Sequence, residues 1–323
     1  MLTLGSLFSG GGGWDQGAWD AGIVPIFAVE MEPWIAKWHR ELFAARIPNH
    51  VTLTSSVTDV DYKRLPHVDF LVSSPPCQST SRSGKAWVER RKKLGLPPKE
   101  ASGTVCDPTV GLATLDAVDG VEPSVVLLEN NADYAKGRTF GLIVAGLKER
   151  GFEVDWKVLR AEEYGVASGR ERLVMRASID ELPPWPTPGK RPSWWDLIRD
   201  LVDEMPVAKL AAWQAKGLAD NPPPPNTPLL IAGGNPNRNS RGYLVHRTPS
   251  QPAWATQLPK NTSGMRVIDQ HGVCHLMSAR AIARLQGFPD DYDPLPASRQ
   301  HAIHILGNSV PPLLAEQILE QFP

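Results

Sequence analysis

The sequence is poor in cysteine, has no long apolar run and carries almost no net charge. Its three cysteines, Cys77, Cys106 and Cys274, lack CxxC spacing, which argues against a disulfide framework or a zinc site and favours a reducing compartment. No apolar stretch reaches the roughly 18 residues that span a bilayer, and Met1–Gly5 lacks the basic start of an export signal. These features predict a cytoplasmic protein with no metal and no membrane anchor.

The formal net charge of −1 gives the chain no overall attraction to nucleic acid. A basic stretch does run from Arg82 to Lys99, where lysine and arginine greatly outnumber acidic residues. This stretch is either a solvated surface loop or a lid that contacts phosphates. Its position shortly after Cys77 keeps the second interpretation open.

Short apolar runs alternate with amphipathic stretches through the first half of the chain. Strands are predicted at 2–8, 26–30, near 51, 68–73 and 125–129, with helices starting near 14, 34, 108 and 141. This alternation predicts an α/β fold with a doubly wound parallel sheet. Strands at 153–159 and 172–177 are expected to complete it, as a hairpin at one edge.

The composition changes after Ala177. From Pro183 to Pro259 the chain is rich in proline and has few periodic runs, apart from helices predicted over 194–204 and 210–218. Helical periodicity returns at 278–286 and 311–321. We therefore expect a first domain formed by 1–181 and 274–323, with a small irregular domain at 182–273 inserted into it.

Glycines 10–13 follow the first predicted strand and precede a helix, a position where the backbone can approach a polar ligand closely. Glu30 ends the second strand, where a carboxylate can accept hydrogen bonds from ribose hydroxyls. Dinucleotide enzymes and S-adenosylmethionine enzymes both use this arrangement. The dinucleotide fingerprint needs a small residue where Asp15 or Gln16 stands, so a nicotinamide or flavin is disfavoured. A glycine turn without a ligand is the remaining alternative.

Two further strand ends carry reactive groups. Pro75-Pro76-Cys77-Gln78 follows the strand at 68–73, and Glu129-Asn130 ends the strand at 125–129. The two strand ends can place the Cys77 thiol and the Glu129 carboxyl on one rim of a parallel sheet. A lone cysteine is more often an inert core residue, and a lone acid after a strand is more often a helix cap. Their combination with Arg170 supports covalent catalysis.

Sequence blocks spread over nearly the whole chain, except about 182–273, resemble the DNA cytosine-5 methyltransferase family of prokaryotic or phage type. The blocks are Leu7–Gly13, Glu30, Pro75–Gln78, Glu129-Asn130, Tyr164–Val166 leading to Arg170–Arg172, Arg284–Pro289 and Gly307–Pro312. The resemblance implies the Rossmann-like fold of S-adenosylmethionine-dependent methyltransferases, with a small irregular target-recognition domain at 182–273.

The resemblance also implies catalytic roles for four residues. The Cys77 thiolate would add to C6 of cytosine, which makes C5 nucleophilic. A protonated Glu129 would bind N3 and the exocyclic amine, while Arg170 and Arg172 would hold the base carbonyl and order Glu129 or the closing loop. Because the reacting carbons lie inside a duplex, the base must be flipped out.

S-adenosyl-L-methionine is the implied cofactor. Its expected contacts are Phe8, Gly10, Gly11, Gly12, Gly13, Glu30, Met31, Ser56, Val57, Pro76, Leu112, Asn308, Ser309 and Val310. Ser55-Ser56-Val57 stands where the family often has an acid that contacts the adenine amine. This departure implies weaker cofactor affinity or compensation by Asp59, and it leaves a modified S-adenosylmethionine open as the donor.

Double-stranded DNA is the implied partner of a monomer, with a cognate restriction endonuclease as a possible second partner. The expected DNA contacts are Gln78, Ser79, Ser81, Arg82, Lys85, Arg238, Arg241 and Thr256. Arginine can read guanine edges in a duplex. The glycine-rich stretch 233–242 is the candidate base-reading loop, with an exposed flexible loop as the alternative.

Three other functions compete with this one: an RNA cytosine-5 methyltransferase of the same fold, a catalytically inactive DNA-binding module, and a dinucleotide oxidoreductase. The long segment 182–273 favours duplex DNA over RNA. Intact Cys77, Glu129 and Arg170 oppose the inactive module, and the Pro-Pro-Cys-Gln run opposes the oxidoreductase.

Overall fold

Strands and helices alternate along the first half of the chain, as the apolar pattern predicts. The computed structural model describes residues 1–76, 108–231, 246–253, 265–292 and 298–323. The chain divides into two compact units. The first contains Met1–Leu159, Glu171–Pro186 and Ala315–Pro323, and the second contains Arg160–Arg170 and Thr187–Leu314. The second unit thus includes most of 182–273 together with flanking segments, and the functional division of the chain stays a prediction.

Within the described residues, the first unit is built on a seven-stranded sheet in the order β3-β2-β1-β4-β5-β7-β6. Neighbours among β1 to β5 pair in parallel, β7 pairs antiparallel to β5, and β6 is the edge strand beside β7. The doubly wound sheet is therefore confirmed. The strands are β1 (Thr3–Leu7), β2 (Val24–Glu30), β3 (Val51–Thr54), β4 (Phe70–Ser73), β5 (Val125–Asn130), β6 (Glu153–Arg160) and β7 (Glu171–Ser178).

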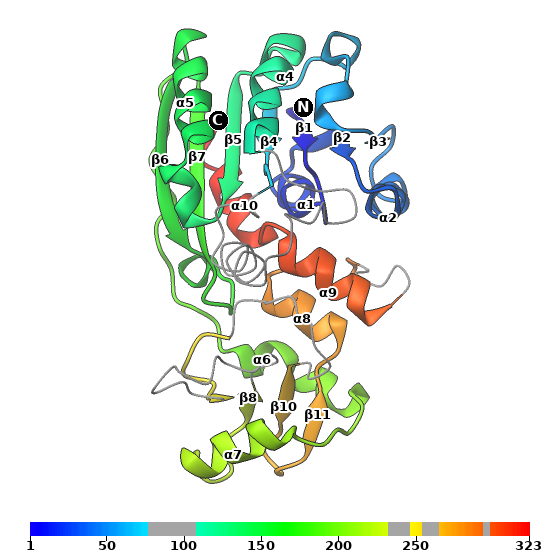
Figure 1. Cartoon of the computed structure of the whole chain (residues 1–323), viewed down its shortest axis with the longest axis vertical. Coiled ribbons are helices and arrows are strands. Elements are labelled where there is room, and N and C mark those ends of the chain that lie inside the picture. The colour runs from blue at the N-terminus through cyan, green and yellow to red at the C-terminus, as the bar shows by residue number, and fades with distance from the viewer. Residues whose placement is uncertain (77–107, 232–245, 254–264, 293–297) are drawn as a thin grey trace, which may run out of the picture. The chain divides into compact units, whose positions relative to one another are not determined.

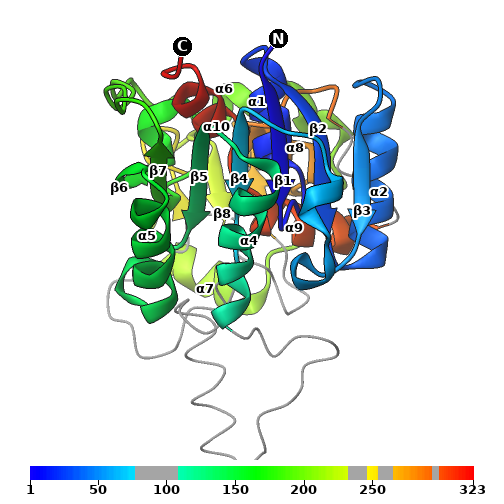
Figure 2. The same ribbon diagram turned by 90° about the horizontal axis from the view of Figure 1, so that it is seen from above.

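Helices cover both faces of this sheet. Right-handed crossovers require α1 and α2 to lie on one face and α4 and α5 on the other, because the strand order runs outward in opposite directions from β1 and β4. Figure 2 shows α4 and α5 in front of the sheet and α1 behind it. The helices are α1 (Gly13–Asp20), α2 (Pro33–Ala44), α4 (Ala113–Val121), α5 (Arg138–Glu149) and α10 (Pro312–Leu319), which begins in the second unit.

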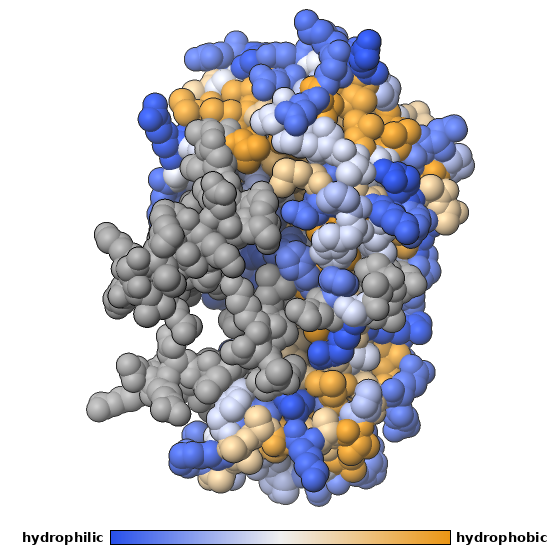
Figure 3. Space-filling model, turned by 45° about the vertical axis from the view of Figure 1, so that its right-hand side comes forward, coloured by the Kyte–Doolittle hydropathy of each residue, from blue (hydrophilic) through white to orange (hydrophobic). Residues whose placement is uncertain are grey.

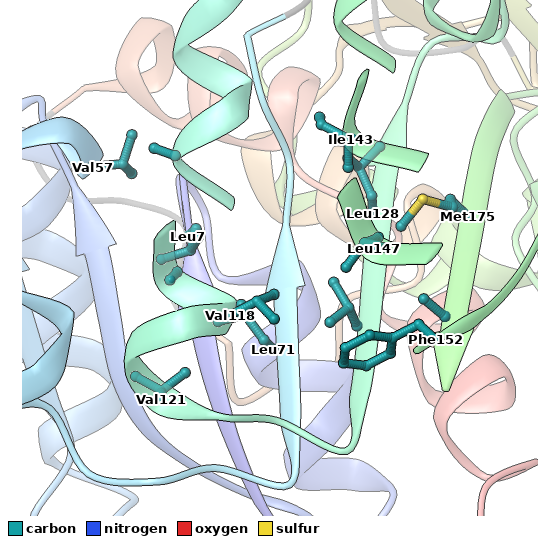
Figure 4. Packing of buried hydrophobic residues seen from close by; sticks show 14 of the residues in the cluster. Leu7, Val57, Leu71, Val118, Val121, Leu128, Ile143, Leu147, Phe152 and Met175 are labelled. Atoms are coloured by element: carbon teal, nitrogen blue, oxygen red, sulfur yellow. The ribbon is translucent and has the colours of Figure 1, made fainter. Parts of the chain in front are cut away.

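The main apolar core of the first unit lies between the sheet and the helices α4 and α5. Every residue of β5 is buried, which explains the apolar run that begins it, since a central strand of a doubly wound sheet is covered on both faces. Ile143 and Leu147 of α5 are fully buried and pack in the same cluster as Leu128 and Met175. Figure 4 shows these side chains gathered between helix and strands.

The second unit contains, in its described part, a four-stranded sheet in the order β11-β10-β8-β9. Figure 1 shows β8, β10 and β11 side by side. The sequence pattern did not predict these strands, because none is longer than three residues and such runs show no periodicity. The elements are β8 (Leu229–Ile231), β9 (His246–Arg247), β10 (Arg266–Ile268), β11 (Cys274–Leu276), α6 (Trp194–Ile198), α7 (Ala212–Asp220), α8 (Ala279–Leu285) and α9 (Arg299–Asn308).

An arginine joins two helices of the second unit. Arg284, near the end of α8, donates to the Leu197 carbonyl of α6 and forms ion pairs with Asp200 and Asp290. The hydrogen bonds from Arg284 lower the pKa of both carboxylates, because a guanidinium donor favours the ionised form. The block Arg284–Pro289 therefore has a structural role within this unit.

The described surface is mixed in character. Figure 3 shows hydrophilic residues spread among smaller hydrophobic areas on the face it presents. Among the described residues, no helix combines the length and the apolar character needed to cross a membrane.

The core beneath the end of β5 generates a stability prediction. Leu128 is completely buried and directly precedes Glu129, so Leu128→Ala should lower the free energy of unfolding by about 2–5 kcal/mol. Denaturant titration measures the change. Leu142→Ala on α5 is the matched control, because Leu142 is 43% exposed, and it should change stability by less than about 0.5 kcal/mol. Equal losses in both variants would contradict the described core.

Candidate active site

The loop after β1 turns sharply. Phe8 has a φ of 56°, Gly10 of 51° and Gly12 of 67°, so three residues of five adopt the left-handed conformation. The loop is tied to β2 by a hydrogen bond from Ser9 N to the Val29 carbonyl at 3.1 Å, and Gly12 N bonds back to the Ser9 carbonyl at 2.8 Å. Its conformation is therefore set by the chain itself and leads directly into α1.

The Glu30 carboxylate is anchored beside this loop. Its Oε2 accepts from Gly10 N at 2.9 Å, and its Oε1 accepts from Glu32 N at 2.8 Å. An ionised carboxylate has about four lone-pair positions, so both oxygens can still accept hydroxyl protons. Burial raises the pKa of Glu30, and the N–H donors of Glu32 and Gly10 and the charge of His39 oppose that rise. The structure thus brings the predicted glycine loop and Glu30 together.

Gly12 is required for packing as well as for its backbone conformation. A Cβ at this position would lie 2.3 Å from a ring carbon of Phe43 and 3.0 Å from His39 Nε2, both on α2. At Gly10 the one described atom that a Cβ would meet within 4 Å is the Phe8 carbonyl oxygen, at 3.8 Å. The loop therefore presses against α2 at Gly12, whereas Gly10 is glycine because of its φ.

The residues expected near the adenine differ in exposure. Met31 is 44% exposed directly after Glu30. Ser56 caps a short helical turn, η1 (Val57–Asp59), through its hydroxyl, which accepts from Thr58 N. The Val57 side chain belongs to the apolar core, so only its backbone is available to a ligand. Asp59 is exposed and accepts from the Thr58 hydroxyl.

The strand ends of β4 and β5 are joined by an asparagine. Asn130 Nδ2 donates to the Pro75 carbonyl at 2.9 Å, and Asn130 is 3% exposed. Ser73 of β4 pairs with Leu128 of β5, so these strand ends are direct neighbours. Pro75 is buried and Pro76 partly buried at the end of the described segment, immediately before position 77. Asn130 therefore fixes the chain that leads to Cys77.

Glu129 is held by an arginine on the adjacent strand. Arg172 Nε lies 2.5 Å from Glu129 Oε1, with the side chains 19% and 7% exposed. The antiparallel pairing of β5 with β7 places Glu129 opposite Val174, two residues beyond Arg172. This nearly buried, charge-assisted contact orients the carboxyl group.

Arg170 and Arg172, which were expected to act as a pair, have different partners. Arg170 is 3% exposed and lies in the second unit, where it donates to the Gly307 carbonyl at 2.9 Å and the Ser309 carbonyl at 3.0 Å. Ser309 is further fixed by its hydroxyl, which donates to the Ile305 carbonyl. Arg170 therefore positions the segment that carries Asn308, Ser309 and Val310.

A short backbone pairing in the second unit adjoins Arg170. Ala253 N donates to the Ala167 carbonyl at 2.8 Å, and Gly169 N donates to the Ala253 carbonyl at 3.1 Å. The segment that leads to Thr256 is therefore anchored beside residues 167–169.

Several predicted residues lie outside the described residues. These are Cys77, Gln78, Ser79, Ser81, Arg82, Lys85, Arg238, Arg241 and Thr256. The described cofactor candidates Pro76 and Leu112 are both partly buried, and Leu112 ends the short helical turn η3 (Pro108–Leu112).

A family model for C-5 cytosine-specific DNA methylases matches residues 2–323. The chain belongs to this family. Two relatives are the Type II methyltransferases M1.HphI of Haemophilus parahaemolyticus, 26% identical over 99% of this chain and 86% of its own, and M.NgoBI of Neisseria gonorrhoeae, 28% identical over 96% and 89%. As a C-5 cytosine-specific DNA methylase, the protein transfers a methyl group from S-adenosyl-L-methionine to cytosine in DNA.

Solved structures agree with the fold of this C-5 cytosine methylase. A DNMT2 mutant from Spodoptera frugiperda superposes with a TM-score of 0.67 at 16% identity and full coverage of both chains. The S. pombe Dnmt2 methyltransferase gives a TM-score of 0.58 at 15% identity, covering 99% of this chain and 97% of the other.

The site residues of the methylase suit S-adenosylmethionine. Glu30 offers carboxylate lone pairs for ribose hydroxyls, and the hydroxyls of Ser9 and Ser74 are buried without a hydrogen-bond partner among the described residues. Ser74 N bonds to the Leu7 carbonyl, so these hydroxyls follow β1 and β4, the neighbouring strands between which the order reverses. Ligands of doubly wound sheets bind at this switch point. Unsatisfied polar groups there fit the polar methionine end of the cofactor.

Sequence reasoning missed three groups of this site. The roles of Ser9 and Ser74 depend on which strands are neighbours, and serine after a strand is too common to be a signal. The contact of Asn130 with Pro75 had only a weak signal in the sequence. Proline has no backbone N–H, so a Pro-Pro step offers carbonyls but few donors, and an amide side chain on a neighbouring strand can donate to one of them.

The raised pKa of Glu30 generates a prediction on cofactor binding. The ionised carboxylate accepts the ribose hydroxyls, so affinity for S-adenosylmethionine should fall as the pH is lowered, starting at a higher pH than for an ordinary glutamate. Binding should release protons in the same range, which calorimetry in buffers of different ionisation enthalpy detects. Glu30→Gln should bind about 10–100-fold more weakly and lose this pH dependence. A pH-independent wild type would show that Glu30 does not contact the ribose.

The contact between Arg172 and Glu129 generates a second prediction. Arg172→Lys keeps the charge but loses the planar donor, so kcat should fall about 10–100-fold while KM for the cofactor changes little. Arg64→Lys is the control, because Arg64 is 84% exposed and should be silent. A raised cofactor KM with normal kcat would contradict a role at the base.

Proposed function

We propose that the protein methylates cytosine within one short duplex DNA sequence, through a covalent adduct between Cys77 and C6 of a flipped cytosine. The observation that carries the proposal is the junction of β4 and β5, where Asn130 holds Pro75 and Arg172 holds Glu129. Pro75 and Pro76, which precede Cys77, and the Glu129 carboxyl therefore lie at the ends of adjacent strands. A nucleophile and an acid on neighbouring strands are what addition to a pyrimidine ring requires.

The chemistry assigned to this chain has an addition and an elimination. The Cys77 thiolate adds to C6, so electron density moves to C5 and N3. The protonated Glu129 carboxyl donates a hydrogen bond at N3 through the oxygen that does not face Arg172 and offsets the charge that develops there, while Arg172, at Oε1, keeps the carboxyl oriented. Once C5 carries the methyl group, a base or water removes the C5 proton, the C6–sulfur bond breaks, and the thiolate leaves as the ring is restored. Arg170 acts at a distance, by holding the carbonyls of Gly307 and Ser309.

S-adenosylmethionine supplies an electrophilic methyl group when it is bound. We assign its ribose to Glu30, its methionine end to the loop from Phe8 to Gly13, and its adenine side to Met31 and the backbone at Ser56 and Val57. Pro76, Leu112, Asn308, Ser309 and Val310 are assigned to the cofactor on the family resemblance alone.

Target recognition is assigned to 182–273, inserted between blocks 1–181 and 274–323 that carry catalysis. Arg238 and Arg241 are proposed to read base edges, and Thr256 to support the flipped nucleotide. Gln78, Ser79, Ser81, Arg82 and Lys85 are proposed to contact DNA behind the flipped base. The pairing of Ala253 with residues 167–169 supports this assignment for Thr256, because it fixes the chain three residues away.

The biological setting is proposed from the relatives. M1.HphI and M.NgoBI are named Type II methyltransferases, so a cognate restriction endonuclease is a reasonable partner for this chain. We further propose that the enzyme works as a monomer in the cytoplasm.

Replacing the nucleophile tests the covalent step. Cys77→Ser should abolish methyl transfer and leave DNA binding intact, because a serine hydroxyl is too weakly acidic to add to C6. A duplex containing 5-fluorocytosine should trap the wild type as an adduct that resists denaturation. Cys274→Ser is the matched control and should trap normally. An adduct that persists with Cys77→Ser would reject the assignment.

The target is read by sequencing plasmid DNA from cells that express the chain, with mass spectrometry of the nucleosides. Methylcytosine confined to one short motif is the expected result. Unmodified DNA with modified cellular RNA would favour an RNA substrate, and an unfamiliar cytosine mass would indicate a modified donor.

A further inference from the structure

A chain of buried polar side chains runs through the first unit beside the glycine loop. Asp15 of α1 and His39 of α2 are fully buried, and Thr52 of β3 and His50, just before β3, are 3% and 7% exposed. None of the four belongs to the predicted catalytic set. Buried polar groups need partners, so the contacts of this chain determine which protons it carries.

The contacts form a continuous series from β2 to α1. His50 Nδ1 lies 3.0 Å from the Pro25 carbonyl, and His50 Nε2 lies 3.2 Å from Thr52 Oγ1. The same hydroxyl lies 3.0 Å from His39 Nδ1, and His39 Nε2 lies 3.6 Å from Asp15 Oδ2. The series therefore links four consecutive elements of the cofactor-binding half.

The Pro25 carbonyl, at one end of the series, fixes the direction of each hydrogen bond. A carbonyl only accepts, so His50 Nδ1 carries a proton and donates to Pro25. Burial lowers the pKa of His50, which keeps it neutral, so its Nε2 accepts from the Thr52 hydroxyl. The Thr52 oxygen must then accept from His39 Nδ1.

The remaining nitrogen of His39 faces a carboxylate. Neither oxygen of Asp15 has a hydrogen-bond partner among the described residues, although the first turn of α1 offers partial positive charge. A lone pair on His39 Nε2 would face the lone pairs of Asp15 between two fully buried side chains, which is strongly unfavourable. A proton must lie between them, and an imidazole is the stronger base in water.

A metal ion is the alternative to that proton. Ligand atoms of Asp15, His39 and His50 lie within 4.8 Å of one another. Both nitrogens of His50 are engaged in hydrogen bonds, however, and so is Nδ1 of His39. One carboxylate and one imidazole nitrogen are too few for a buried structural metal, which takes about four ligands.

We propose that His39 is an imidazolium paired with the Asp15 carboxylate, and that this pair positions the cofactor-binding loop and Glu30. Asp15 lies in the first turn of α1, which the loop enters through Gly12, and a Cβ at Gly12 would lie 3.0 Å from His39 Nε2. His39 lies on α2, which begins three residues after Glu30. The pair thus joins the two helices that start from the two cofactor contacts.

The charge of His39 has a further effect on the site. A positive His39 lowers the pKa of Glu30 and so favours the ionised carboxylate that accepts ribose hydroxyls. Asp15 and His39 are positioning residues, because neither is assigned a contact with the cofactor. The inference rests on the proposed assignment of the loop and Glu30 to the cofactor.

The protonation state is tested on the wild-type enzyme without cofactor or DNA. Histidine labelled with nitrogen-15 gives separate ring signals for neutral and charged imidazoles, and His39→Gln assigns the His39 signals. At neutral pH we expect His39 to carry protons on both nitrogens and His50 to be neutral. A neutral His39 would overturn the proposal, as would a stoichiometric divalent metal in the purified enzyme that is lost in Asp15→Asn.

The positioning role is tested by a double-mutant cycle on cofactor affinity. Asp15→Asn and His39→Gln should each raise the Kd for S-adenosylmethionine about tenfold, and the double variant should bind no more weakly than either single one. At saturating cofactor, kcat should stay within about twofold of the wild type. Asp61→Asn, an exposed control in the same unit, should leave the Kd unchanged.

The outcomes separate this inference from the proposed function. If the double variant raised the Kd by the product of the two single effects, or if kcat fell while affinity stayed normal, the two residues would have independent structural roles and the positioning pair would be rejected. If the wild-type enzyme bound no cofactor, the proposed cofactor site would be rejected, but the nitrogen-15 spectrum would still report the protonation state of His39. Should Asp15→Asn fail to fold, the wild-type spectrum still decides the protonation state.

Discussion

Parallel pairing of β1, β4 and β5 is the constraint on which the candidate site depends. Parallel strands end at one edge of a sheet, and the strand order reverses between β1 and β4, so the loops after these strands diverge and leave room for a ligand. The glycine loop, the Pro75 step and Glu129 all start from this edge. The buried side chains between the strands and the helices α4 and α5 hold that edge fixed. Leu128 belongs to this core and directly precedes Glu129, so the packing of Leu128 also helps to hold Glu129 in place.

Three carboxylates of the first unit are balanced in different ways, and each way suits a different task. Glu30 is held by backbone N–H groups, which cannot move away when a ligand binds. Glu129 is held by the side chain of Arg172, which can rearrange when a base takes up hydrogen bonds. Asp15 is balanced by one buried imidazole, the arrangement that costs most to disturb, because loss of either partner leaves an unpaired buried charge.

The chemistry of this protein is easier to predict from the sequence than the contacts of its individual side chains. The blocks around Cys77, Glu129 and Glu30 predict the reaction and the cofactor, because the chemistry demands those residue types at strand ends. Arg170 and Arg172 look equivalent in the sequence, yet they bond to different segments, since partners distant along the chain decide where each guanidinium goes. The second unit was the least predictable part, because strands of two or three residues leave no periodic signal.

The glycine loop shows why motif residues need a physical reason at each position. Gly10 meets the demand of its φ, but Gly12 also allows α2 to approach, and α2 brings His39 toward Asp15. In the proposed site, cofactor affinity therefore depends on residues that are assigned no contact with the cofactor. In that site, the ionisation of Glu30, which a charged His39 favours, contributes to the same binding energy.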